Sequence, residues 1–253
     1  MDTKKTQRKR APRTGRRTAK ATRHASAPPA RTPQRHSSRA LEQTIAAMRG
    51  AIAGGRAASV TEIAHRDRDP FRVLISTILS LRTKDEVTTA ASERLFALAD
   101  TPRTLAALSP RTIERAIFPA GFYRTKARTV RDVAHRIDVE YNGRVPDTIE
   151  ALLDFKGVGR KTAALVVSLG YGKEAICVDT HVHRISNRLQ WVKTRSPDET
   201  ERALMIVLPR RHWIGINDTM VSFGQRVCLP VSPRCSACPL FAACPREGVL
   251  RHR

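Results

Sequence analysis

Four cysteines lie close together near one end of this 253-residue chain. They follow the spacing Cys-x6-Cys-x2-Cys-x5-Cys and are Cys228, Cys235, Cys238 and Cys244. Four thiolates on so short a segment suit a tetrahedral zinc ion or a 4Fe-4S cluster, and the spacing alone does not distinguish them. They indicate a metal or cluster site in a reducing compartment rather than a disulfide framework. The fifth cysteine, Cys177, lies in an apolar run and is predicted to be a buried free thiol.

A glycine turn with a lysine beside it interrupts a helical pattern at 152–164. Glycines permit positive φ, and the N–H groups of the turn and of the next helix can bind an anion, here a DNA phosphate. The helix dipole and the neighbours Arg160 and Lys156 disfavour the ammonium form of Lys161. A neutral lysine amine is a nucleophile that can form a Schiff base. The alternative is an ordinary helical hairpin whose lysine only contacts phosphate.

A carboxylate at Asp179 precedes another helical pattern. Its plainest interpretation is a helix N-cap. Beside an amine nucleophile it could also assist deprotonation, activate a water, or stabilise positive charge that develops at a sugar C1′. His181 follows closely and is ambiguous, whereas His183 is predicted to be a surface or capping histidine.

The elements that must position these residues are helices. From Leu41 onward, apolar residues recur at three- and four-residue spacing, as they do in 71–79. Ser109 and Ser196 each precede a proline and are typical helix starts. Ser196 with Glu199, and Asp147 with Glu150, have capping-box spacing. We expect an all-α fold of about ten helices joined by short Gly/Pro loops.

The chain is strongly basic, with 46 Lys+Arg against 23 Asp+Glu and a formal net charge of +23. Residues 1–40 hold 13 Lys/Arg, one acid and almost no large apolar side chain. They are predicted to form a disordered basic arm that tethers nucleic acid, with a transit peptide as the alternative. The remaining residues still carry a net +11, which makes a polyanion the expected partner.

Membrane and secretory classes are not supported. No run of 18 or more apolar residues occurs, so no membrane span is predicted. No apolar segment follows the basic start, as it would in a secretory signal. We expect a cytoplasmic, nucleoid-associated protein if the source is bacterial.

Taken together, these motifs resemble the endonuclease III family of DNA glycosylase/AP lyases. The resemblance rests on the helix-hairpin-helix segment GVGRKTA (157–163), the segment VDTH (178–181) and the cysteine spacing, and it spans roughly residues 41–246. It implies that Lys161 attacks C1′ of a damaged nucleotide, displaces the base and forms a Schiff base, from which β-elimination cleaves the strand. Asp179 would be the catalytic carboxylate.

The resemblance also implies a cofactor and a substrate class. The four cysteines would ligate a 4Fe-4S cluster that is mainly structural and positions a basic loop on DNA. The substrates would be oxidised or ring-saturated pyrimidines and abasic sites, flipped out of duplex DNA during base excision repair. We expect the protein to bind damaged double-stranded DNA as a monomer.

The implied fold has two helical domains with the active site in the cleft between them. Residues 63–173 would form a six-helix barrel that includes the helix-hairpin-helix motif at 152–164. Residues 41–62 and 174–253 would form the domain that carries the cluster loop, 228–244.

Flipping leaves a gap in the duplex, which the family fills with wedge side chains. By position these are Arg82 and Phe122. The family usually has glutamine in place of Arg82, and arginine cannot accept a hydrogen bond from the orphaned base. It could donate to guanine or stack, so the base preference should differ, unless Arg82 contacts only phosphate. The remaining DNA contacts are expected from Gly157, Val158, Gly159, Arg160, His181 and Arg184.

Three other functions are weighed against this one. Monofunctional glycosylases of the adenine-removing type lack the hairpin lysine and carry a glutamate before the wedge segment, which 75–79 does not contain. A specialised AP lyase with weak or altered glycosylase activity would follow from Arg82. A non-catalytic iron–sulfur DNA-binding protein is disfavoured because Lys161 and Asp179 are both present.

Overall fold

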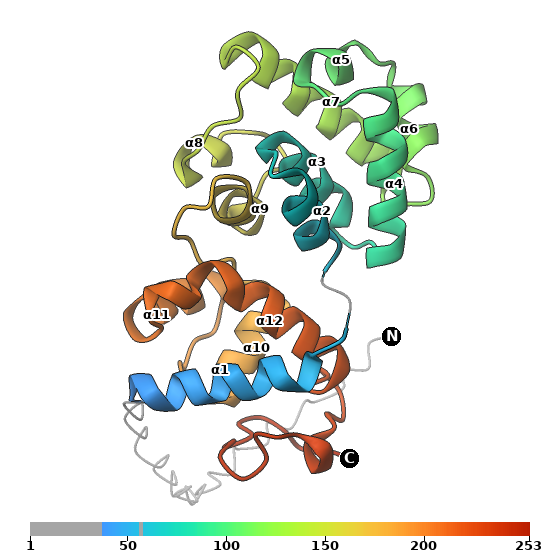
Figure 1. Ribbon diagram of the computed structural model, residues 1–253. Helices are drawn as coiled ribbons and strands as arrows, with labels where there is room; N and C mark the ends of the chain where they lie inside the picture. The colour runs from blue at the N-terminus through green and yellow to red at the C-terminus, as the bar shows by residue number, and fades with distance from the viewer. Residues whose placement is uncertain (1–36, 56–57) are drawn as a thin grey trace, which may run out of the picture. The chain divides into compact units, whose positions relative to one another are not determined.

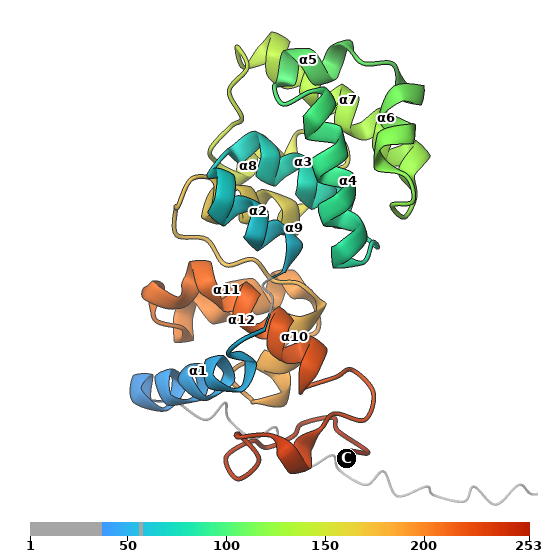
Figure 2. The same ribbon diagram turned by 45° about the vertical axis from the view of Figure 1, so that its right-hand side comes forward.

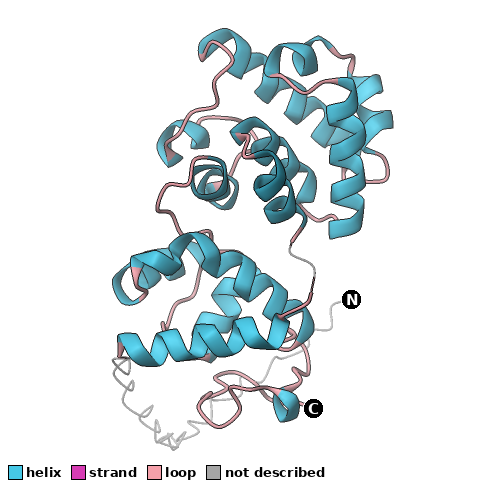
Figure 3. Cartoon of the chain, viewed as in Figure 1, coloured by secondary structure: helices cyan, strands magenta, loops and turns pink. Residues whose placement is uncertain are grey.

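The computed structural model describes residues 37–55 and 58–253. Every regular element in these two stretches is helical and neither contains a strand, which confirms the all-α prediction (Figures 1 and 3). The described chain has twelve α-helices, against about ten expected. None of the described helices is long and apolar enough to cross a membrane.

The α-helices are α1 (Ser38–Ile52), α2 (Ser59–Asp67), α3 (Pro70–Ser80), α4 (Asp85–Leu98), α5 (Pro102–Ala107), α6 (Pro110–Ile117), α7 (Tyr123–Glu140), α8 (Ile149–Leu153), α9 (Arg160–Leu165), α10 (Thr180–Arg188), α11 (Pro197–Val207) and α12 (Trp213–Arg226). A π-helix continues α9 over Val166–Gly170, and 3-10 turns cover Arg210–His212 and Cys235–Ala237.

Most helix starts lie where capping chemistry predicts them. Ser109 accepts a hydrogen bond from the Thr112 N–H, and Ser196 from the Glu199 N–H. The predicted start at Asp147 is wrong. Thr148 is the N-cap of α8 instead, because its hydroxyl accepts from the Ala151 N–H.

The beginning of the folded chain also differs from the prediction. A basic arm is predicted for residues 1–40, and its residues 1–36 lie outside the described residues. Residues 37–40 are not part of an arm, because α1 begins at Ser38 and is capped by the Ser37 hydroxyl. The single helix expected near 41–62 is two helices, α1 and α2. The predicted boundary at residue 63 therefore falls inside α2.

A first apolar core includes residues of α2 to α9. It runs from Val60 to Ala175, and α3 lies at its centre, packed on α2, α4, α7 and α9 (Figure 1). Leu74, Ile75 and Leu79 are fully buried. Because an apolar residue occurs on every side of α3, this helix must be covered by neighbours all round.

A second apolar core joins the two ends of the described chain. It combines Leu41, Ile45 and Met48 of α1 with residues from Ile176 onward. α1 packs against α12, and α12 against α10 (Figure 2). Partly buried Cys228, Cys238 and Cys244 lie against this core, so the cysteine segment has an apolar base.

Candidate active site and cysteine pocket

The turn between α8 and α9 needs glycine at one of its two glycine positions. Gly157 has φ +89, and a Cβ there would lie 2.7 Å from Cγ2 of Thr129 on α7. Gly159, the N-cap of α9, has φ −99 and open space around the position of a Cβ. Val158 is buried and packs into the first core, which fastens the turn between them.

Lys161 lies in the first turn of α9 and is partly buried. Its carbonyl oxygen accepts a weak hydrogen bond from the Cys177 thiol at 3.7 Å. As predicted, Cys177 is buried, and burial raises the pKa of this thiol. The thiol therefore stays protonated and unreactive.

Asp179 is the N-cap of α10. One carboxylate oxygen accepts from the N–H groups of His181 and Val182, both at 2.9 Å, and the residue is 9% exposed. These two bonds orient the carboxylate and leave its second oxygen for other chemistry. The N-cap role is thus present, and it does not exclude a role in catalysis.

His181 brings the charged residues of this region together. Its pKa is lowered, first by burial, and the charges of Asp179, Arg184, Lys161 and Asp85 all act on it. The imidazole is therefore neutral at pH 7. Lys161 lies in the first turn of α9 and Asp179 at the N-cap of α10, and the charges of both residues act on this ring.

Two arginines predicted to contact DNA form hydrogen bonds with other groups of the protein. Arg160 pairs with buried Glu201 of α11, with nitrogen–oxygen distances of 2.5 and 2.9 Å. Arg184 donates to the Cys228 carbonyl at 2.8 Å and lies 3.2 Å from Nδ1 of His181. These bonds join α9 to α11, and α10 to the cysteine segment.

His183 differs from its prediction as a surface or capping residue. Its Nδ1 lies 2.7 Å from Oγ1 of Thr200 and the side chain is partly buried. The contact attaches α10 to α11, so the histidine belongs to the packing of the second core rather than to the surface.

The two predicted wedge residues lie together although forty positions separate them. The guanidinium carbon of Arg82 is 5.5 Å from the centre of the Phe122 ring. Both residues are exposed, Phe122 at 62%. Both also have positive φ, 53 and 57, which side-chain-bearing residues adopt only where the surroundings impose it.

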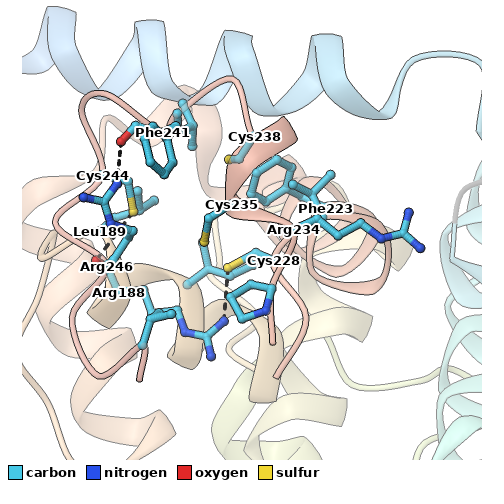
Figure 4. A pocket seen from close by; sticks show the side chains of 15 residues that line it. Arg188, Leu189, Phe223, Cys228, Arg234, Cys235, Cys238, Phe241, Cys244 and Arg246 are labelled. Atoms are coloured by element: carbon cyan, nitrogen blue, oxygen red, sulfur yellow. Dashed lines mark hydrogen bonds between the residues drawn. The ribbon is translucent and has the colours of Figure 1, made fainter. Parts of the chain in front are cut away.

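The four clustered cysteines line one pocket with apolar side chains and three arginines (Figure 4). Arg188 is 9% exposed and donates to Sγ of Cys228 at 3.3 Å and to the carbonyl oxygens of Leu229 and Pro230. Within residues 37–55 and 58–253 it forms no ion pair with a carboxylate. A buried cation without a carboxylate partner favours an anionic group nearby.

The thiols themselves are shielded from water. Burial raises the pKa of Cys235, Cys238 and Cys244. In the described part of the chain, no three Cys, His, Asp or Glu side chains converge closely enough to hold a single metal ion. The cysteines thus surround one pocket without meeting at one point.

Four residues of this region were not singled out from the sequence. Asp85 accepts from Ser59 and Gln225, Glu201 holds Arg160, Arg188 lies against Cys228, and Lys126 lies beneath the Arg82 turn. Their partners are distant in sequence, and no local motif marks them. An internal lysine or glutamate in an otherwise apolar helical stripe is the only signal that could have indicated Lys126 and Glu201.

Comparison with known proteins agrees with this geometry. Residues 75–210 match the model of the HhH-GPD superfamily of base excision DNA repair proteins. The chain is 51% identical to endonuclease III of Thermotoga maritima over 180 residues, covering 71% of this chain and 84% of that one. Endonuclease III of Bacillus subtilis is 35% identical over 193 residues, covering 76% and 87%.

A solved structure described as a trapped endonuclease III–DNA covalent intermediate has a TM-score of 0.74 and 32% identity, covering 83% of this chain and 97% of that one. The chain therefore belongs to the HhH-GPD superfamily of base excision DNA repair proteins. Within it, the chain is an endonuclease III-type DNA glycosylase and AP lyase that binds DNA.

Proposed function

We propose that the protein removes oxidised pyrimidines from damaged duplex DNA, with Lys161 as the nucleophile and Asp179 as the catalytic carboxylate. The observation that carries this proposal is the hydrogen bond from the Cys177 thiol to the Lys161 carbonyl, which joins the first turn of α9 to the segment that leads into Asp179, the N-cap of α10. A nucleophilic amine and an oriented carboxylate at one point are what a glycosylase with lyase activity requires.

The first step forms one bond and breaks another. The neutral amine of Lys161 attacks C1′, the N-glycosidic bond breaks, and the base leaves with that bond's electron pair and takes up a proton. Opening of the sugar ring and loss of the remaining amine proton give a Schiff base. Removal of a proton from C2′ then expels the 3′ phosphate as the C3′–O bond breaks, which cleaves the strand.

Asp179 is placed to serve these steps electrostatically and by proton transfer. One of its oxygens is held by two N–H groups, which keeps the carboxylate in place throughout the reaction. The other oxygen can accept a proton from the amine and stabilise the cation that develops at C1′. The neutral His181 ring beside it excludes water without adding a competing positive charge.

The turn around Gly157, Val158 and Gly159 supplies the backbone contacts to DNA in this proposal. The Val158 N–H already donates to the Phe155 carbonyl at 3.0 Å, so the N–H groups that would bind a phosphate are those of the two glycines and of the first turn of α9. The exposed Arg82 and Phe122 then enter the gap that the flipped nucleotide leaves.

The residues of the cysteine pocket fit a 4Fe-4S cluster. The four cysteines line one pocket together, and each would bind a different iron. The buried Arg188 beside Cys228 would balance the negative charge of the thiolates. The cluster's contribution would be structural: it would fix residues 228–244 against α10 and α12.

Borohydride trapping tests the nucleophile. Reduction of the Schiff base should attach the parent protein covalently to an oligonucleotide that contains an abasic site or a thymine glycol. Lys161→Ala should abolish the adduct, while Lys156→Ala, which removes an exposed lysine five residues away, should keep it. If Lys161→Ala traps as well as the parent, the assignment is wrong.

The presence of Arg82 favours a second candidate function, that of an AP lyase with weak or altered glycosylase activity. The guanidinium has only donors, so it reads the base opposite the lesion differently from an amide side chain. A panel of lesion duplexes, assayed separately for base release and strand cleavage, distinguishes the two. Arg82→Gln should change base selectivity more than cleavage at abasic sites.

The remaining parts of the proposal concern assembly and the arm. We infer that the protein acts as a monomer, in the compartment that holds the DNA. The basic segment 1–36, which lies outside the described residues, would add affinity that depends on salt. Deleting it should weaken DNA binding and reduce the dependence on salt while leaving single-turnover cleavage at saturation intact.

A further inference from the structure

A buried lysine lies beneath the turn that presents Arg82. Lys126, on α7, is 6% exposed. Its Nζ donates to the carbonyl oxygens of Leu79 at 2.7 Å and Leu81 at 2.6 Å, and to Oγ1 of Thr83 at 2.7 Å. Burial lowers the pKa of Lys126 to about 8. Below that pH the three hydrogens of the ammonium group have three acceptors, so the side chain ties α7 to the end of α3.

These acceptors lie on both sides of Arg82. Thr83 Oγ1 also accepts from the Gly121 N–H at 3.1 Å. Gly121 itself lies against the Arg82 carbonyl oxygen, so closely that a Cβ would overlap with it. The turn at Arg82 is therefore held in place by the hydrogen bonds of Lys126 and by its close contact with Gly121.

The same contacts control Phe122. This residue precedes α7 with φ 57 and follows Gly121 directly, while Arg82 has φ 53. Two side-chain-bearing residues in the left-handed region persist only when surrounding contacts hold them there. The network from Lys126 through Thr83 to Gly121 is the set of contacts that joins these two turns.

We propose that Lys126 is a positioning residue for base eversion. It fixes the position and orientation of Arg82 and Phe122 relative to each other, so that both enter the duplex gap together. This inference rests on the proposed wedge role of the two residues. Lys126 acts through them, since its buried amine cannot reach DNA. An apolar side chain would fill the same space but take the ammonium donor from both carbonyls, which leaves Leu81 with the Thr83 hydroxyl at 3.3 Å.

The test compares a substrate that needs the wedge with one that does not. Lys126→Met keeps a long unbranched side chain and removes the ammonium group. Lys193→Met, at an exposed position remote from the Arg82 turn in sequence, removes the same charge and serves as the matched control. The substrates are a duplex with one thymine glycol and a single-stranded oligonucleotide with one abasic site, which has no opposite base and no gap.

Lys126→Met should slow single-turnover base release from the duplex by roughly 10- to 100-fold, the loss expected when contacting groups shift by about 1 Å. Borohydride trapping on the single strand should stay within about twofold of the parent. Lys193→Met should match the parent on both substrates. Equal loss on both substrates, or no loss on the duplex, would overturn the proposal.

A double-mutant cycle separates positioning from general stabilisation. If Lys126 acts through the wedge, Lys126→Met should cause little further loss in a chain that already carries Arg82→Ala and Phe122→Ala. If the fold-loss of Lys126→Met and that of the Arg82→Ala, Phe122→Ala chain multiply in full, the proposal is overturned. Thr83→Val, which removes the shared hydroxyl, should show the same pattern to a smaller degree and serves where Lys126→Met fails to fold.

Failure of the underlying wedge role has its own signature. In that case the Arg82→Ala, Phe122→Ala chain releases the base from duplex DNA as fast as the parent does. That outcome would rule out both the wedge role and the role of Lys126. If the Arg82→Ala, Phe122→Ala chain releases the base slowly but Lys126→Met releases it as fast as the parent, only the role of Lys126 is ruled out.

Discussion

Replacing Gly157 by alanine should destabilise the protein far more than the same change at Gly159. At Gly157 the backbone has φ +89, which costs a side-chain-bearing residue about 1–3 kcal/mol. The new Cβ would also lie 2.7 Å from Cγ2 of Thr129, and overpacking of this kind costs about 1–3 kcal/mol. Thr129 cannot simply rotate, because its hydroxyl donates to the Thr125 carbonyl at 3.1 Å. The expected loss in unfolding free energy is about 2–6 kcal/mol.

A second substitution divides this loss into its two causes. Thr129→Ser removes Cγ2 and keeps the hydroxyl, so the chain with Gly157→Ala and Thr129→Ser should recover the part due to the clash. The part due to φ should remain. Gly159→Ala is the control: with φ −99 and open space, it should fall within about 0.5 kcal/mol of the parent or be slightly more stable.

Thermal melting followed by circular dichroism measures these effects on protein of identical cofactor content. At about 2–4 °C per kcal/mol for a chain of this size, Gly157→Ala should lower Tm by roughly 4–24 °C. Gly159→Ala should leave Tm nearly unchanged. Equal shifts for the two variants, or no recovery with Thr129→Ser, would refute the reasoning from backbone conformation and packing.

Three further outcomes are expected. Glu201→Gln should lower the unfolding free energy by about 1.5–3 kcal/mol, measured by urea unfolding, because Arg160 loses a buried charged partner; a stability equal to the parent's would contradict this. Arg188→Met should reduce the visible absorbance expected from the proposed 4Fe-4S cluster, because the thiolates that would hold it lose the cation beside Cys228; absorbance equal to the parent's would count against that role. Cys177 should resist alkylation by iodoacetamide at pH 8 in the native protein and react after unfolding, because its raised pKa keeps the thiol protonated; rapid native labelling, followed by mass spectrometry, would refute its burial.

Local patterns predicted the helices and most of their starts. Serine before proline marks a helix start at Ser109 and Ser196, though not at Ser232, since the hydroxyl caps an N–H group three residues away and needs no distant partner. The prediction failed at Asp147, where the next residue, Thr148, has equal capping chemistry. It also failed at 41–62, where Gly54 and Gly55 follow the end of α1 and the two helices join different cores.

The sequence by itself determined the chemistry of this protein. Lys161 follows a glycine turn, Asp179 precedes a helix, and four cysteines share one short segment. Each of these features lies within a few residues, so spacing along the chain sets its geometry. The class of enzyme follows from them, and the comparisons confirm it.

Only the tertiary structure decided which cations are engaged inside the protein and which remain at the surface. Arg160, Arg184 and Lys126 look like other basic residues in the sequence, but their partners lie 41, 44 and 43–47 residues away. The physical reason is that a buried charge must find its acceptors wherever the fold brings them. Because helix packing brings those groups together, no local pattern could show that Lys126 supports the turn of Arg82.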